Sequence, residues 1–488
     1  MAVVTDPGTD PTRLRRVLGP LEVTASGVGI IIGAGIYVLL GAATAQAGNA
    51  VWLSFLVAAG LCGLTGLSYA ELASMFPSAG AEYDYTRRVF PARWAFLVGW
   101  TMTVGLMVAA AAIAVGFAHY LQYFVDVPLV AAAVALLVFD AMVASSGIGR
   151  SARLTLALSA LQVAGLCFVI VIGASHVGDR SVLSDATVGG VVGAAALVFF
   201  AFIGFDEVIT LAEETRDPTR VIPRALFAAL GISALLYMAV AITAVSVIGA
   251  AALAESNRPL ADVMAHVLGG NAQGAVAAIA LLTTTNTSLL ALTAASRLTY
   301  GMADAGALPT GVRRVSRRTG APTAGILIAV VGAVSFALIG DLTFVASVTD
   351  FAVYAVFLAV NASVVVLRRT APDVARPFRI PGSIRGVPVI PVAGSIAALA
   401  MVPQLEVRSL WLGAALLVSG LLAYVALGRP SSREADDLGD DSRDSWGFRS
   451  CDVEPNGPGV GARRVARSNR ARPGGADAEK GGALGDRR

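Results

Sequence analysis

The fold is decided by residues 26–37, which read Ser26-Gly27-Val28-Gly29-Ile30-Ile31-Ile32-Gly33-Ala34-Gly35-Ile36-Tyr37. They lie inside an apolar run at 24–45 that is long enough to cross the roughly 30 Å core of a bilayer as a helix. Glycine destabilises a helix interior by about 1 kcal/mol relative to alanine, so this helix is weakest at its middle. Either the small residues let neighbouring helices pack closely there, or the helix is interrupted.

A second apolar run, at 188–212, has the same feature. Its middle reads Phe199-Phe200-Ala201-Phe202-Ile203-Gly204-Phe205-Asp206-Glu207. The two runs are the first and the sixth of twelve, and each opens a block of five. Glycine-interrupted helices at matching places in two halves are typical of inverted repeats that bind a substrate near the middle of the membrane. This placement favours interruption over close packing.

The twelve apolar runs predict an all-α membrane protein with twelve transmembrane helices. We expect a 5+5 inverted repeat with discontinuous first and sixth helices, plus two extra helices. The runs lie at 24–45, 50–75, 93–124, 128–146, 154–175, 188–212, 225–250, 272–302, 324–340, 344–367, 387–405 and 409–427. The expected parts are an N-terminal segment at 1–21, a membrane domain at 22–427 and a tail at 428–488. Within the domain, repeat one covers about 22–175, repeat two about 188–367 and the extra helices about 387–427.

The composition excludes an ordinary soluble enzyme. Of the residues, 56% are hydrophobic and 14% are charged, whereas soluble domains carry about 25% charge. The last 60 residues hold 23 of the 69 charged side chains and are rich in Gly, Pro, Ser, Asp and Arg, so we expect a disordered tail. A net charge of +3 gives no reason to expect a nucleic-acid partner.

Several enzyme classes are excluded by residues that the chain lacks. Its single lysine is Lys480, so the membrane domain cannot contain the lysine-bearing loop that binds ATP phosphates. The cysteines Cys62, Cys167 and Cys451 are far apart and do not form a disulfide or metal pattern. With three histidines, no HExxH motif and no evident nucleophile–base pair, we expect no enzyme activity, no metal and no cofactor.

The arginines predict the orientation in the membrane. If the N-terminus is cytoplasmic, the inner segments before the tail hold 20 arginines, whereas the outer loops hold Arg180, Arg258 and Arg408. Such an excess of positive charge marks the cytoplasmic side of a membrane protein. Residues 1–20 are polar and do not form a cleavable signal peptide. We therefore expect a multi-pass protein of the cell membrane with both termini in the cytoplasm.

The interrupted helices suggest what the protein binds. A helix that restarts after Gly33 presents free N–H groups and the positive end of its dipole, which suit a carboxylate. The carbonyl groups that end the first halves, near Ile30–Ile31 and Phe200–Ile203, suit an ammonium group. Such unpaired groups are tolerated within a membrane only where they line a wet cavity or hold a ligand. An anion site beside a cation site fits the zwitterionic backbone of an amino acid.

At these residues the chain resembles the amino acid–polyamine–organocation permeases, and most closely the branch of cationic amino acid transporters and their bacterial relatives. Three stretches carry the resemblance: residues 29–37 match GxxIGxGIF, residues 199–214 match FxAFxGFDxxxxxxEE, and residues 216–223 match (N/D)P-x-R-x-x-P. The likeness covers about residues 15–425. It implies secondary transport of α-amino acids by alternating access.

The resemblance also implies a set of site residues. The family binds the substrate carboxylate on backbone amides and the ammonium group on backbone carbonyls, and an aromatic side chain closes over the substrate. Carried to this chain, the amides are those of Gly33, Ala34 and Gly35, the carbonyls are those of Ile31, Phe200, Ala201 and Ile203, and the gate is Phe205. For Phe205, packing against the core or lipid is the alternative interpretation.

One position departs from the family. Proton-coupled relatives carry a lysine in the fifth span near the first interruption, and Gln162 occupies that position here. Glutamine can donate a hydrogen bond to carbonyl groups of the first span, but it cannot titrate. We therefore expect weak or absent proton coupling by that route, which leaves facilitated uptake, exchange or a different titrating group.

Other polar residues lie inside the expected spans. Asp206 and Glu207 either cap the second half of span six or sense substrate or protons, and Asp206 is the better candidate for sensing. In span eight, hydroxyl and amide groups either line an aqueous path or bond to their own helix. These groups include Thr284, Thr285 and Asn286. We expect Asp140, Asp350 and His119 to lie at the membrane interface.

Two other functions fit the same sequence. A polyamine or organic-cation carrier of the same fold would tolerate substrates without a carboxylate. A sensor would bind amino acids without moving them and would signal through its tail. Competition by putrescine tests the first alternative, and transport after deletion of residues 429–488 tests the second.

Overall fold

The structure is a computed structural model that describes residues 18–76, 81–146, 151–184, 186–316 and 319–427. The expected tail at 428–488 lies outside the described residues, as does most of the expected N-terminal segment. The described chain is almost entirely helical, with one short antiparallel hairpin of β1 (Ser383–Ile384) and β2 (Val387–Pro388).

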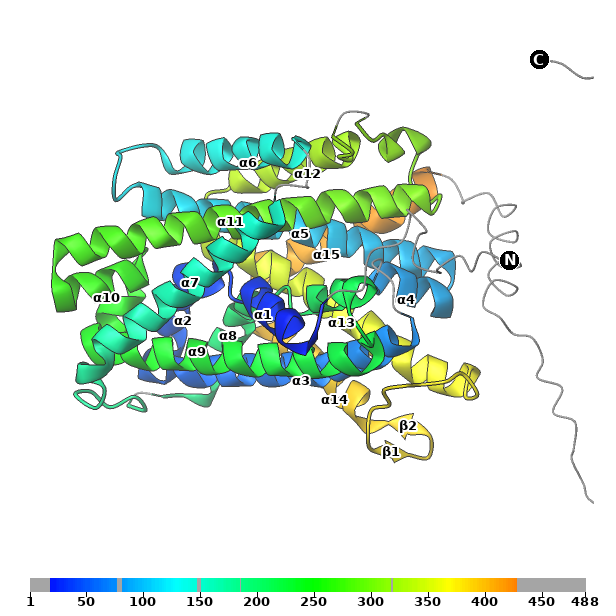
Figure 1. The fold of residues 1–488 in the computed structure, drawn as a ribbon, viewed down its shortest axis with the longest axis horizontal. Coiled ribbons are helices and arrows are strands. Elements are labelled where there is room, and N and C mark those ends of the chain that lie inside the picture. Colours follow the sequence, from blue (N-terminus) through cyan, green and yellow to red (C-terminus); the bar gives the residue numbers. More distant parts are fainter. Residues whose placement is uncertain (1–17, 77–80, 147–150, 185, 317–318, 428–488) are drawn as a thin grey trace, which may run out of the picture. The chain divides into compact units, whose positions relative to one another are not determined.

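The helices follow one another with short connections (Figure 1). The α-helices are α1 (Pro20–Ile31), α2 (Gly35–Ala47), α3 (Val51–Met75), α4 (Ala81–Val89), α5 (Ala92–Leu121), α6 (Leu129–Ser145), α7 (Ser151–Gly173), α8 (Val188–Val198), α9 (Pro218–Ala254), α10 (Pro259–Leu268), α11 (Gly270–Asp304), α12 (Thr323–Ala337), α13 (Leu342–Thr370), α14 (Val389–Met401) and α15 (Val407–Ala426). The 3-10 helices are η1 (Gly48–Ala50), η3 (Ala174–His176), η4 (Phe199–Phe202), η5 (Asp206–Glu214), η6 (Thr310–Arg313) and η7 (Val402–Gln404).

Many of these helices have the length and composition of membrane spans. In the described chain, eight helical stretches are long and apolar enough to cross a bilayer, and five further apolar helices have 10–17 residues. The sequence predicted twelve spans. The two counts differ because α2, η1 and α3 form one continuous stretch at Gly35–Met75, and because several expected spans, such as α6 and α12, are shorter than a full crossing.

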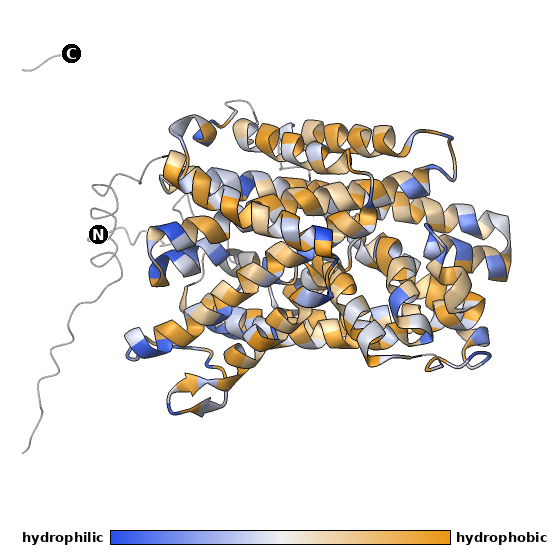
Figure 2. Cartoon of the chain, turned by 180° about the vertical axis from the view of Figure 1, so that it is seen from behind, coloured by the Kyte–Doolittle hydropathy of each residue, from blue (hydrophilic) through white to orange (hydrophobic). Residues whose placement is uncertain are grey.

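The long helices α3, α5, α9 and α11 run along the same direction in Figure 1, and α6 and α12 pack against each other at one edge. α5 packs against α11, and α3 packs against α9. These two pairs enclose the interrupted helices. Hydrophobic residues follow the middles of the helices, and hydrophilic residues collect toward the ends (Figure 2). This pattern is what a bilayer requires of spanning helices.

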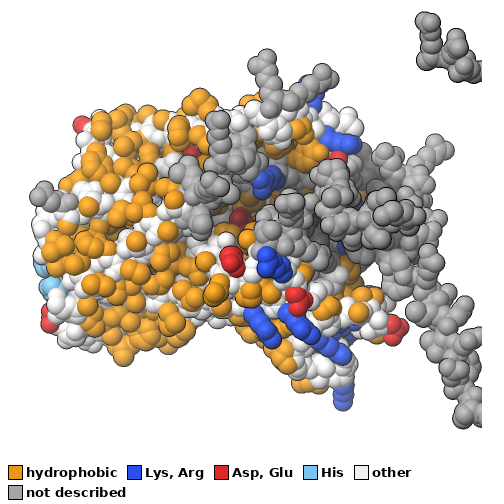
Figure 3. Space-filling model, in the orientation of Figure 1, with side chains coloured by type: hydrophobic (Ala, Val, Ile, Leu, Met, Phe, Trp, Pro, Cys, Tyr) orange, Lys and Arg blue, Asp and Glu red, His pale blue; other side chains and the backbone are white. Residues whose placement is uncertain are grey.

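The surface is likewise divided into a hydrophobic region and a charged region. In Figure 3, hydrophobic side chains cover most of one face, and arginine side chains gather toward the end near α4 and the hairpin. Exposed hydrophobic residues include Val171, Leu235 and Leu327. A continuous apolar surface of this kind is unfavourable in water and favourable in lipid.

Both helices that the glycines predicted to be interrupted are interrupted in the structure. α1 ends at Ile31 and α2 begins at Gly35. α8 ends at Val198, and the chain then continues as η4 and η5. Gly204, between η4 and η5, has a φ of 106°, a conformation that glycine adopts without steric cost. Gly35 serves close approach instead, because a Cβ atom there would collide with the Cα of Ala201.

A buried ion network fixes one end of the helix bundle. The carboxylate of Glu71 on α3 accepts hydrogen bonds from Nε of Arg368 at 3.0 Å and from the amide of Ile380 at 2.9 Å. Arg376 lies beside Glu71 and donates to the carbonyl groups of Leu367 and Ala371 at the end of α13. The segment between α13 and α14 is thereby held against α3.

Candidate functional site

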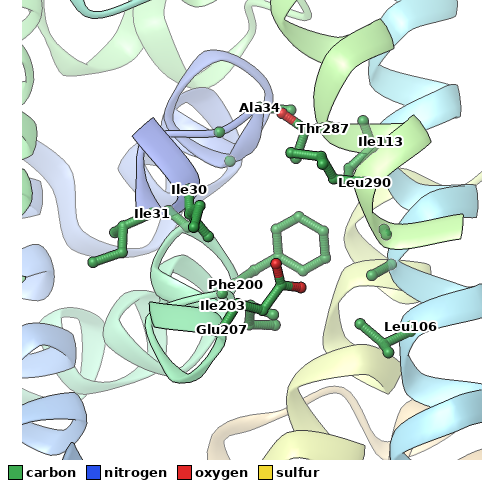
Figure 4. A pocket seen from close by; sticks show the side chains of 16 residues that line it. Ile30, Ile31, Ala34, Leu106, Ile113, Phe200, Ile203, Glu207, Thr287 and Leu290 are labelled. Carbon is green, nitrogen blue, oxygen red and sulfur yellow. The ribbon is translucent and has the colours of Figure 1, made fainter. Parts of the chain in front are cut away.

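A cavity lies where the two interrupted helices meet (Figure 4). Its walls come from α1, α2, η4, the 203–207 turn, α5 and α11. The lining residues are Ile30, Ile31, Gly33, Ala34, Gly35, Leu106, Ala109, Ile113, Phe200, Ala201, Ile203, Gly204, Glu207, Thr287, Leu290 and Ala291. All seven residues that the sequence assigned to the carboxylate and ammonium sites are among them. The structure therefore brings together segments that lie about 170 residues apart in the chain.

One wall of the cavity carries the start of α2. Ala34 is the N-cap of α2 and Gly35 is its first residue, and a helix leaves the N–H groups of its first turn without intrahelical acceptors. The amide of Gly33 donates to the carbonyl of Ile31 at 2.9 Å across the interruption. The free N–H groups and the positive end of the helix dipole give this wall an affinity for anions.

Beside this wall lie carbonyl groups that end the first halves of the interrupted helices. The carbonyl oxygens of Ile31 and Ala201 both accept a hydrogen bond from the hydroxyl of Tyr237 on α9, at 2.8 and 3.0 Å. Tyr237 is fully buried. Sequence reasoning missed this residue. Its only signal is a tyrosine in the middle of an apolar span, where a buried hydroxyl needs a partner.

Gln162 lies against the end of α1. Its Nε2 donates to the carbonyl of Gly29 at 3.1 Å, and the hydroxyl of Ser159 lies 3.3 Å from the same oxygen. The hydroxyl of Tyr37, on α2, donates to the backbone carbonyl of Gln162 at 2.9 Å. α7 is thus joined to both halves of the first interrupted helix by neutral groups.

Phe205 does not line the cavity in this conformation. It is buried beside the cavity, with its ring centroid 5.7 Å from that of Tyr69 and 5.6 Å from that of Phe357. The aromatic ring that reaches the cavity is that of Phe200, and the carboxylate of Glu207 lies next to it (Figure 4). Glu207 is the one acidic residue among the lining residues, and the charge of Arg297 acts on it.

Some polar residues of α11 bond to the backbone of their own helix, and one lines the cavity. The hydroxyls of Thr284 and Thr285 bond to backbone carbonyls one turn earlier, and these residues do not line the cavity. Asn286 is buried, and its Nδ2 atom has no hydrogen-bond partner among the described residues. Thr287, which the sequence did not single out, is the hydroxyl residue that lines the cavity.

Two carboxyl groups expected at the membrane interface are buried between helices. Asp140 and Asp350 are both fully buried, and their side-chain oxygens have no hydrogen-bond partner within the described chain. α6 and α13 place these residues on faces packed against other helices, which hydropathy alone does not reveal. Their position at the membrane interface stays a prediction, because burial between helices does not fix depth in a bilayer.

Asp206 caps the second interruption and meets an acidic partner. Its Oδ1 accepts a hydrogen bond from the amide of Gly204 at 3.2 Å. Its carboxyl group also acts directly on that of Glu82, which is buried on α4. The pKa of Glu82 is raised to about 8, mainly by burial and next by the charge of Asp206. Sequence reasoning missed Glu82, which lies in a short polar helix between two spans.

Among the described residues, no three His, Cys, Asp or Glu side chains gather as a metal site would require.

The sequence is similar to those of known transporters. The family profile described as "Amino acid permease" matches residues 18–426. An uncharacterized transporter of Mycobacterium tuberculosis is 36% identical, over 86% of this chain and 93% of that protein. The branched-chain amino acid permease BcaP of Bacillus subtilis is 31% identical, over 86% and 94%. Cationic amino acid transporter 4 of Mus musculus is 31% identical, over 73% and 60%.

Proposed function

The chain belongs to the amino acid permease family, and we propose that it moves α-amino acids across the cell membrane as a secondary transporter. It is an integral membrane protein and a transporter rather than an enzyme. The proposed mechanism is alternating access, in which the substrate binds between the two interrupted helices and the surrounding helices rock about it.

The observation that carries this proposal is the pairing of opposite backbone ends in one cavity. The amides of Ala34 and Gly35 supply an anion site, and the carbonyls at the ends of α1 and η4 supply a cation site. An amino acid carries a carboxylate and an ammonium group on neighbouring atoms, so it can engage both sites at once. We propose Gly33, Ala34 and Gly35 for the carboxylate, and Ile31, Phe200, Ala201 and Ile203 for the ammonium group.

The side chains around the cavity suggest which amino acids are accepted. Leu106, Ile113 and Leu290 form an apolar wall that suits aliphatic substrate side chains. Glu207 adds one acidic group, which favours neutral or cationic substrates over acidic ones. The named relatives include both a branched-chain amino acid permease and a cationic amino acid transporter, which is consistent with this range.

The proposal includes a topology. We propose twelve spans arranged as two inverted five-helix repeats and two extra helices, with both termini in the cytoplasm. The two matching interruptions, in α1–α2 and α8–η5, support the repeat. The excess of arginine in alternate connections supports the orientation. Substituted-cysteine labelling from the two sides of the membrane tests both points.

The experiment that tests the function is substrate counterflow in proteoliposomes. Liposomes that contain the purified protein and unlabelled leucine should accumulate labelled leucine, and Gly35→Ala should abolish this exchange because its Cβ collides with Ala201. Gly60→Ala is the matched control, since Gly60 lies on α3 and a Cβ atom there would meet no other atom within 4 Å. Absence of counterflow for all twenty amino acids would contradict the proposal.

A polyamine or other organic cation is the second candidate substrate, and Glu207 favours it. A carboxylate in the cavity can bind a second ammonium group without any substrate carboxylate. Putrescine that competes with leucine as well as arginine does would support this candidate. Competition only by compounds that carry an α-carboxylate would support the amino acid transporter.

A further inference from the structure

Two acidic side chains meet between α4 and the second interruption. Glu82 and Asp206 are each 6% exposed, and their carboxyl groups act directly on each other. Two neighbouring buried carboxylates repel each other, whereas a carboxyl group that keeps its proton can donate a hydrogen bond to a carboxylate beside it. Burial of both groups side by side therefore favours a pair that holds one proton.

The surroundings of the pair do not supply a compensating positive charge. The titratable groups that face it are Tyr69 and Cys62 of α3, Tyr85 of α4 and Glu207 of η5. All of these are neutral or acidic. The helices α5, α9 and α13 also pack against α4 or η5, and within the described residues they add no charged group that acts on either carboxyl. A second negative charge in this place would be unfavourable.

The pair is attached to the second interruption, which borders the proposed substrate site. Asp206 accepts the amide of Gly204 at the interruption, and Glu82 accepts the hydroxyl of Tyr69 at 2.9 Å. Phe205, between Gly204 and Asp206, packs against the Tyr69 ring. Loss of the shared proton would set two carboxylates against each other where α4 meets η5, so the protonation state and the position of these elements depend on one another.

We propose that Glu82 and Asp206 together bind one exchangeable proton that is released and rebound during each transport cycle. This inference rests on the proposed transport function. The pair carries one negative charge when it holds the proton and two when it has released the proton to water, and no bond other than O–H is broken or formed. The pair would take the place of the titrating group that Gln162 cannot provide.

The first test is spectroscopic and needs no transport. Difference infrared spectra of the purified protein below and above pH 8 should contain the C=O band of one protonated carboxyl group that disappears at high pH. The band should be absent in both Glu82→Gln and Asp206→Asn. It should persist in Asp84→Asn, a control on the same helix whose side chain lies 3.6 Å from Arg87 at the surface. A band unchanged in both pair variants would overturn the proposal.

The second test measures coupling in proteoliposomes. Uptake driven by an imposed pH gradient should be lost in Glu82→Gln, whereas counterflow, which needs no net proton movement, should continue. Wild-type protein with counterflow but no gradient-driven uptake would overturn the coupling role, as would Glu82→Gln with wild-type gradient-driven uptake. Failure of counterflow in the wild type would instead count against the transport function, and the infrared result would still decide whether the pair holds a proton.

Discussion

The hydroxyl of Tyr237 lies 2.8 Å from the carbonyl oxygen of Ile31, at the last residue of α1. The same hydroxyl lies 3.0 Å from the carbonyl of Ala201, within η4. One hydroxyl hydrogen is therefore shared between the two interrupted helices. Because both carbonyls border the proposed ammonium site, Tyr237 sets the distance between the two halves of that site.

We predict that Tyr237→Phe weakens substrate binding and lowers stability. The change leaves two buried carbonyl groups without this donor, and an unsatisfied buried polar group costs about 1–3 kcal/mol. We expect a higher KM in counterflow assays and a lower Tm. Tyr354→Phe is the control, since the Tyr354 hydroxyl donates to the carbonyl of Ala196 on α8 alone. Equal loss of transport in both variants would show that Tyr237 acts only through stability.

We predict that Glu207 excludes acidic substrates. When Glu207 is ionised, a substrate carboxylate about 5 Å away is repelled by roughly 3 kcal/mol at an effective dielectric constant of about 20. That energy corresponds to about a hundredfold difference in affinity. Glu207→Gln should therefore make glutamate a competitor of leucine uptake and should weaken competition by arginine. Glu255→Gln, at an exposed helix end, should change neither. Unchanged competition by both amino acids in Glu207→Gln would remove the residue from the specificity site.

The interruptions could be predicted from the sequence because their causes are local. Gly204 adopts a backbone conformation that few other residues tolerate, and an apolar run of span length leaves few alternatives to a membrane helix. The interruptions indicated the two backbone stretches that border the cavity, and the resemblance to the family gave the seven proposed positions within them. The long-range partners could not be predicted this way. Tyr237 and Glu82 reach the site from other helices, and their contacts depend on how those helices are rotated.

The same limit explains why the sequence did not identify the cavity-lining residue of α11, the expected eighth span. Thr284 and Thr287 are almost one helical turn apart, and the hydrophobic pattern of α11 does not show which of them faces the cavity. The buried carboxyl groups of Asp140 and Asp350 illustrate the point again, because a span end and a packed face look alike in a hydropathy pattern. Side-chain positions around the site require the packing of α5, α9 and α11.

We predict that Gln162→Ala leaves the pH dependence of transport unchanged. The side chain donates to the carbonyl of Gly29 but cannot titrate, and Ser159 remains 3.3 Å from the same oxygen. The expected stability loss is about 1 kcal/mol, the value of one hydrogen bond. Counterflow rates measured across a pH series check this prediction. A shifted pH profile would mean that Gln162 tunes a titrating group after all.

We predict that Glu71→Ala is among the most destabilising single changes in the described chain. It leaves the buried guanidinium groups of Arg368 and Arg376 without their counter-ion, and breaking a buried ion pair costs about 3–5 kcal/mol. Asp304→Ala breaks the exposed pair with Arg313 and should cost less than about 1 kcal/mol. Thermal unfolding in the same detergent compares the two. Similar Tm values for both variants would contradict the prediction.

The pH dependence of stability gives a further check on Glu82. Its pKa is raised from 4.5 to about 8 in the folded protein, so between these values the folded state holds a proton that the unfolded state has released. Stability then falls as pH rises through this window, by at most about 1.4 kcal/mol per pH unit. Glu82→Gln removes the titrating group but keeps a side chain that can donate to Asp206. We therefore expect the Tm of Glu82→Gln, relative to wild type, to increase steadily from pH 5 to pH 8. A constant Tm difference across that range would mean that Glu82 titrates normally.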